Sequence, residues 1–132
     1  MFNQFKKFTV EIEGLLINYV IGGSGPAILL LHGYPQTHVM WHKVADQLAE
    51  HYTVVASDLR GYGDSDKPPT NETHTPYSKR ASGNDQVKLM QLLGFNKFGC
   101  STLTCMFYSD CASSPSYNTT GCAGIIVEIA CL

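Results

Sequence analysis

Hydrophobic and polar residues alternate near the start of the chain in a way that predicts paired strands. Every second residue of Phe8–Glu13 is apolar, which is the period of a half-buried strand. The alternation resumes over Leu15–Ile21 after a glycine, and a run of Gly, Ser and Pro at residues 22–26 ends it. We therefore expect an antiparallel hairpin.

Two later apolar runs do not alternate, which is typical of strands buried on both faces of a mainly parallel sheet. These runs are Ala27–Leu31 and Tyr52–Ala56. Apolar residues spaced three and four apart predict one helix over Thr37–Glu50 and a second over Tyr77–Leu93. A further strand is expected to start at Lys97 or one residue later. Strands that alternate with helices indicate an α/β fold.

Charge and hydropathy exclude several classes of partner. Nine Lys and Arg are outnumbered by eleven Asp and Glu among the 132 residues, so the chain has no basic surplus for nucleic acid. No apolar stretch approaches the roughly 20 residues that span a bilayer. Lys6 and Lys7 are not followed by the apolar segment of a secretory signal. We therefore expect a cytoplasmic protein that binds neither nucleic acid nor a membrane.

Composition changes abruptly near residue 99. All nine basic residues lie at or before Lys97, and all five cysteines follow Gly99. Residues 100–132 are rich in Cys, Ser and Thr and hold only two charged residues. The cysteines are odd in number, lack C-x-x-C spacing and have no histidine among them, so we expect neither a metal site nor a closed disulfide set. The chain is thus predicted to consist of a structured part, 1–99, and a tail, 100–132.

A short motif follows the first buried strand. His32, Gly33, Tyr34 and Pro35 come directly after this strand and before a predicted helix, at the sheet edge where α/β folds bind ligands. Glycine permits close backbone approach, and an aromatic–proline peptide can be cis. The Tyr34 N–H can therefore be aimed at a developing oxyanion. On its own, H-G-x-P is only moderately specific.

Three stretches together carry a family resemblance. They read L-L-L-H-G-Y-P-Q-T-H-V-M-W-H at Leu29–His42, D-L-R-G-Y-G-D-S at Asp58–Ser65, and Y-S-K-R-A at Tyr77–Ala81. Over residues 8–98, approximately, the chain resembles the N-terminal part of α/β hydrolases of the haloacetate (fluoroacetate) dehalogenase and soluble epoxide hydrolase group. The match is closest to the dehalogenases. The resemblance implies a small haloacid or epoxide as substrate and no cofactor.

The resemblance also implies roles for individual residues. Tyr34 would provide an oxyanion-hole N–H from the loop motif formed by His32, Gly33 and Pro35, with Pro35 in the cis form. Trp41 would lie near the floor of the substrate pocket. The glycines of the Asp58–Ser65 loop would be structural.

Simpler interpretations stand beside these roles. His32 can be a buried histidine that ties the loop together, and Trp41 can be a core residue. Asp58 and Arg60 could be an acid and an anion clamp, but a carboxylate and a guanidinium in a glycine-rich loop more often fix that loop. The other histidines have no spacing typical of a metal site.

The chemistry expected after the fifth strand is missing from the sequence. Family members use an Asp in a G-x-D-x-G elbow as nucleophile and a later histidine that activates water. No such elbow follows Gly99, Ser101 lacks flanking glycines, the last histidine is His74, and no arginine follows Arg80 to hold a carboxylate.

We therefore predict an α/β-hydrolase fold truncated before the elbow, without catalytic nucleophile or base, and inactive alone. The alternatives are an epoxide hydrolase-like fragment, a non-enzymatic or regulatory piece, and a gene-model product. An exposed apolar edge of the truncated sheet could promote association.

Overall fold

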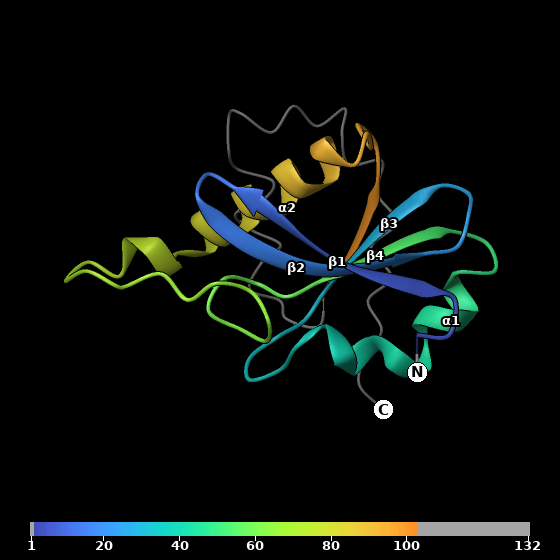
Figure 1. The fold of residues 1–132 in the computed structure, drawn as a ribbon, viewed down its shortest axis with the longest axis horizontal. Coiled ribbons are helices and arrows are strands. Elements are labelled where there is room, and N and C mark those ends of the chain that lie inside the picture. The colour runs from blue at the N-terminus through green and yellow to red at the C-terminus, as the bar shows by residue number, and fades with distance from the viewer. Residues whose placement is uncertain (1, 103–132) are drawn as a thin grey trace.

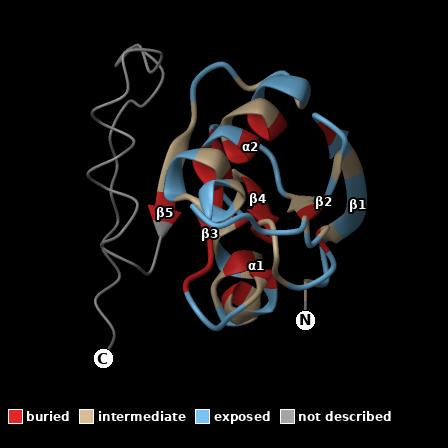
Figure 2. Ribbon diagram, turned by 90° about the vertical axis from the view of Figure 1, so that its left-hand side faces the viewer, coloured by how far each residue is buried: buried red, intermediate tan, exposed pale blue. Residues whose placement is uncertain are grey.

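Five strands form one mixed sheet in the computed structural model, which describes residues 2–102. The sheet order is β1-β2-β4-β3-β5. Figure 1 shows the ribbon, and Figure 2 labels all five strands in this order. β1 pairs antiparallel with β2, and β2 with β4, whereas β3 lies parallel to both β4 and β5. The strands are β1 (Phe5–Ile12), β2 (Leu15–Gly22), β3 (Ala27–Leu31), β4 (Thr53–Ser57) and β5 (Gly99–Thr102). The predicted α/β class with a hairpin and a mainly parallel sheet is confirmed.

The predicted hairpin is present, and β1 begins three residues earlier than expected. Its turn consists of Glu13 and Gly14, both with positive φ, as a two-residue hairpin turn requires. The alternation on β2 is incomplete, because Asn18 and Val20 are buried as well as Ile17 and Tyr19. β2 lies between β1 and β4, and buried residues lie on both of its faces.

The single helix predicted over Thr37–Glu50 is wrong. The segment forms a 3-10 helix, η1 (His38–Lys43), and one short α-helical turn, α1 (Ala45–Leu48). The buried residues Trp41, Ala45 and Ala49 still share one side. A step of three residues returns to the same side of a 3-10 helix and to within about 60° of it in an α-helix, so a short run of apolar spacing does not separate the two helix types.

The second helix is confirmed with shifted bounds. A short 3-10 helix, η2 (Thr75–Tyr77), precedes α2 (Lys79–Leu92), and the Ser78 hydroxyl caps α2 by accepting a hydrogen bond from the Ala81 N–H at 3.1 Å. The buried face of α2 is partly polar. Leu89 and Met90 are fully buried, and three polar residues, Ser82, Asp85 and Gln86, are buried beside them.

Helices cover both faces of the sheet. α2 lies on one face, and η1 with α1 lies on the other, as Figures 1 and 2 show. Each face has its own apolar cluster: Leu89 and Met90 pack on Ile17 and Leu29, whereas Trp41 and Ala45 pack on other strand residues. No helix in the described part of the chain has the length and apolar character needed to cross a bilayer.

β5 extends across the change in composition at residue 99, since it includes residues 100–102. The expected start at Lys97 or Phe98 is therefore one or two residues early. The expectations about the cysteines after Cys100 fall on residues 103–132, outside the described residues. The boundary between 1–99 and 100–132 and the association through an apolar edge stay predictions.

Two leucines of α2 test how this helix packs on the sheet. Leu89 is 0% exposed and Leu92 is 63% exposed. Leu89→Ala should lower the free energy of unfolding by about 2–5 kcal/mol through lost contacts and an internal cavity. Leu92→Ala should change it by about 0.5 kcal/mol or less. Urea unfolding followed by circular dichroism measures both, and equal effects would contradict this packing.

Candidate functional site

The carboxyl ends of β3 and β4 bring the two conspicuous sequence motifs together. Leu31 pairs with Ser57 at the last position of the two parallel strands. His32 and Asp58 therefore follow at the same sheet edge. This edge is where α/β sheets place their ligand sites. The loop of residues 32–38 and the loop of residues 58–66 meet here.

The 32–38 loop presents the Tyr34 amide without a partner. The Tyr34–Pro35 peptide is cis, as the resemblance implies. Within the loop, the Gln36 N–H donates to the Gly33 carbonyl at 2.9 Å. The Tyr34 N–H has no hydrogen-bond acceptor within the described residues, and the Tyr34 side chain is 81% exposed. The loop therefore leaves the Tyr34 N–H available at the sheet edge, together with the N–H groups of Gly33 and Thr37, which likewise have no acceptor within the described residues.

His32 joins the two loops. Its ring is fully buried, and its Nε2 accepts a hydrogen bond from the Leu59 N–H at 3.0 Å. The proton consequently resides on Nδ1, which lies 3.0 Å from the Gly33 carbonyl and donates to it. Burial lowers the pKa of His32, which keeps the ring neutral as this pattern requires. The interpretation of His32 as a buried tie is confirmed.

Asp58 is the centre of the polar network. Its side chain is fully buried and accepts four hydrogen bonds. Oδ1 accepts from the N–H and from Nδ1 of His38, each at 2.8 Å. Oδ2 accepts from Asn18 Nδ2 at 2.8 Å and from the Asp64 N–H at 3.1 Å. Burial alone would raise the pKa of Asp58, but these donors outweigh it and hold that pKa well below its usual range. Asp58 is ionised at neutral pH.

Gly63 makes room for this carboxylate. A Cβ at position 63 would lie 2.3 Å from Oδ2 of Asp58, and the Gly63 φ of +51° also disfavours side chains. Gly61 is required for a similar reason, because a Cβ there would lie 2.6 Å from the Tyr77 ring. The glycines of the Asp58–Ser65 loop are structural.

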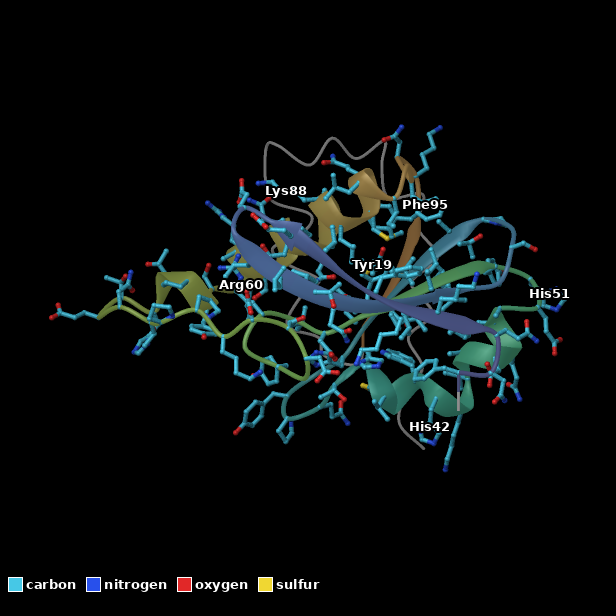
Figure 3. The ribbon with its side chains drawn as sticks, viewed as in Figure 1. Tyr19, His42, His51, Arg60, Lys88 and Phe95 are labelled. Atoms are coloured by element: carbon cyan, nitrogen blue, oxygen red, sulfur yellow. The ribbon has the colours of Figure 1, made fainter. Side chains whose placement is uncertain are left out.

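Arg60 ties the same loop to α2. Its Nε and Nη2 donate to the two oxygens of Asp85, each at 2.7 Å, and its Nη1 donates to the Pro76 carbonyl at 2.7 Å. The hydrogen bonds to Asp85 raise the pKa of Arg60, although burial opposes the change. Figure 3 shows Arg60 beside α2. Through these three internal contacts, Arg60 fixes the loop.

Two other candidates belong to neither of the two loops. Trp41 is 3% exposed and packs in the apolar cluster beneath η1. Ser101 is 4% exposed and lies within β5, beside Leu30, so it does not occupy a strand-to-helix turn. An open depression of about 400 Å³ is lined by residues that include Arg60, Asn84 and Asp85, and none of its lining residues belongs to the 32–38 loop.

Sequence reasoning missed three contributors to the network: Asn18, His38 and Asp85. His38 was one of several histidines without a motif, and Asn18 occupies a position that alternation assigns to the polar side of β2. No local signal identifies them, because their partners lie 20 to 40 residues away along the chain. Within residues 2–102, His, Cys, Asp and Glu form no group of three suited to a metal ion.

The lowered pKa of Asp58 gives a prediction with a defined sign. Asp58→Asn should reduce the free energy of unfolding at pH 7 by roughly 1.5–3 kcal/mol for each hydrogen bond that the amide cannot accept. The contribution of Asp58 is complete above the unfolded-state pKa of about 4 and is lost as the pH falls through the lower folded-state pKa. The difference in the free energy of unfolding between Asp58→Asn and the unchanged chain should therefore shrink below pH ~4.

Urea unfolding at a series of pH values between neutral and strongly acidic measures this difference. Glu50→Gln is the matched control, since it makes the same chemical change at an exposed position. A difference that stays constant with pH would show that Asp58 is not stabilised as an anion.

Comparisons with known proteins agree with this geometry. Residues 26–101 match the family model described as alpha/beta hydrolase fold. A fluoroacetate dehalogenase of Burkholderia sp is 53% identical over 98 residues, which are 74% of this chain and 32% of that protein. A soluble epoxide hydrolase of Corynebacterium sp. (strain C12) is 44% identical over 88 residues, 67% of this chain and 29% of that protein.

A solved structure supports the same relationship. A protein from Nostoc sp PCC 7120, described as an alpha/beta hydrolase, superposes with a TM-score of 0.75 at 51% identity. The superposition covers 77% of this chain and 35% of the Nostoc chain. This chain therefore spans about a third of the length of the relatives it matches. It belongs to the alpha/beta hydrolase fold family and is related to fluoroacetate dehalogenase and soluble epoxide hydrolase.

Proposed function

We propose that this chain supplies the oxyanion-binding part of a hydrolase site for a small haloacid, with an epoxide as the second candidate. The observation that carries the proposal is the Tyr34 N–H, which has no acceptor within residues 2–102 and lies in a loop held at the carboxyl edge of the sheet. The higher identity to the fluoroacetate dehalogenase than to the epoxide hydrolase, 53% against 44%, favours the haloacid.

The chemistry that an unpaired amide can support is stabilisation of negative charge. When water attacks an ester intermediate, the carbonyl oxygen becomes an oxyanion, and a backbone N–H already aimed at that oxygen stabilises it without reorganisation. Tyr34 acts through this backbone group, while its side chain extends toward solvent and contacts the ring of Tyr62.

We further propose that these 132 residues are not a catalyst by themselves. After Gly99 the sequence has no G-x-D-x-G, G-x-S-x-G or G-x-C-x-G, and its last histidine is His74. His38 forms an aspartate–histidine pair with Asp58, but it is 8% exposed and lies against Phe2. A group so enclosed does not reach a substrate, so a nucleophile and a base would have to come from other residues.

The isolated chain should therefore release no halide from fluoroacetate or chloroacetate and open no small epoxide. Halide-electrode and diol assays with and without the chain measure this, and the Burkholderia relative serves as positive control. Turnover that increases in proportion to the amount of purified chain would contradict the proposed lack of activity.

A chimera tests the oxyanion role directly. Residues 8–98 of this chain would replace the matching segment of the Burkholderia fluoroacetate dehalogenase. Tyr34→Pro removes the N–H and should lower the kcat of the chimera about 10²–10³-fold. Tyr34→Ala keeps the N–H and should change kcat little, since the side chain is exposed. Thermal melts establish that each variant is folded, and equal kcat values in folded Pro and Ala variants would refute the role of the amide.

A further inference from the structure

The 32–38 loop has little of its own to hold it in place. Its exposed residues Tyr34, Pro35 and Gln36 bury no core surface. The internal hydrogen bond from Gln36 to Gly33 shapes the turn but does not attach it to the sheet. The position of the Tyr34 amide therefore depends on what holds the two ends of the loop.

Both ends are held by adjacent residues that follow β4. At the upstream end, the Leu59 N–H donates to His32. At the downstream end, Oδ1 of Asp58 accepts two hydrogen bonds from His38, one from its backbone and one from its ring. Hydrogen bonds to an ionised acceptor are roughly twice as strong as neutral ones, so the downstream contact is the stronger anchor.

Asp58 is itself rigidly placed. Asn18 holds its other oxygen from β2, and the Asp64 N–H holds the same oxygen from within the 58–66 loop. The Asp58 N–H also donates to the Asn18 carbonyl at 2.9 Å, and the Ser65 hydroxyl donates to the Asp58 carbonyl at 2.7 Å. The carboxylate thereby fixes the 32–38 loop relative to the sheet.

We propose that Asp58 is a positioning residue that fixes the Tyr34 amide at the sheet edge through its two hydrogen bonds from His38. The catalytic consequence rests on the proposed oxyanion function, but the positioning itself does not. An amide at position 58 offers one acceptor oxygen and an amino group with two N–H donors, where the carboxylate meets four donors. Because the amino group cannot accept, the donors that faced the replaced oxygen lose their acceptor, which weakens the network that holds the loop.

Amide hydrogen exchange on the full chain tests the positioning without any activity. Asp58→Asn should speed exchange of the His38 and Met40 amides about 10- to 100-fold relative to amides of β3 and β4. The matched control is Asp85→Asn. It makes the same change at another buried carboxylate, which accepts two hydrogen bonds from Arg60 and does not contact the 32–38 loop. This control should speed exchange in α2 and leave the loop unchanged.

Two results would overturn the proposal. One is unchanged loop exchange in a folded Asp58→Asn chain. The other is equal acceleration of loop, strands and α2 in both variants, which would mean that Asp58 contributes only to global stability.

A double-mutant cycle in the chimera tests the consequence for catalysis. Asp58→Asn should lower kcat by the order of 10- to 10²-fold with little change in KM. It should cause no further loss in the Tyr34→Pro background, since both changes act on one amide. Additive losses would refute positioning. If Tyr34→Pro alone has no effect, the proposed function fails, and the exchange experiment still decides the positioning.

Discussion

A single buried negative charge organises this end of the molecule. Asp58 carries its charge in the interior, where removal from water costs several kcal/mol unless hydrogen bonds offset it. Four donors from three separate segments supply that compensation. Each donor therefore has to lie within hydrogen-bonding distance of the carboxylate: Asn18 on β2, His38 at the start of η1, and Asp64 in the loop that follows β4. The requirement for Gly63 arises from the same charge, because a side chain there would occupy the space of the carboxylate.

The loop after β4 uses this charge and a second ion pair to bridge the layers of the fold. Asp58 faces the 32–38 loop on the η1 side, and Arg60 reaches α2 on the opposite face of the sheet through Asp85. Asp58 and Arg60 are two residues apart, and their contacts connect the sheet edge to both helical layers. Arg60 and Asp85 form a bidentate pair with a side-chain exposure of 12% and 1%, so solvent screens it little. The loop after β4 thus uses polar contacts to connect the sheet edge to η1 and to α2.

The sequence predicts the apolar part of this architecture well and its polar part poorly. The hairpin, the buried strands β3 and β4 and the second helix follow from local periodicity, because their apolar residues pack against whatever core is available. Asn18, Asp85 and Gln86 are polar but buried, and each has a hydrogen-bond partner far along the chain. The 3-10 geometry of η1 also escapes a pattern of apolar spacing, because residues three apart lie within about 60° of one side in either helix type.

The same division holds for the candidate site. The H-G-Y-P motif identifies the loop, and the tie formed by His32 could be proposed from its position alone. His38 carries no motif, and only the three-dimensional structure shows that it is the contact between that loop and Asp58. Residues that position a functional group are the hardest to predict because their role is defined by distance in space.

Asp58 and a neutral His32 hold the two ends of the 32–38 loop. The most direct test is to determine the imidazole protonation of the full chain at pH 7 by long-range ¹H–¹⁵N NMR correlation. The structure predicts that His32 carries its single proton on Nδ1, leaving Nε2 to accept from Leu59, and that Nδ1 of His38 is protonated and donates to Asp58. A proton on Nε2 of His32, or an unprotonated Nδ1 in His38, would show that these hydrogen bonds do not hold the ends of the loop.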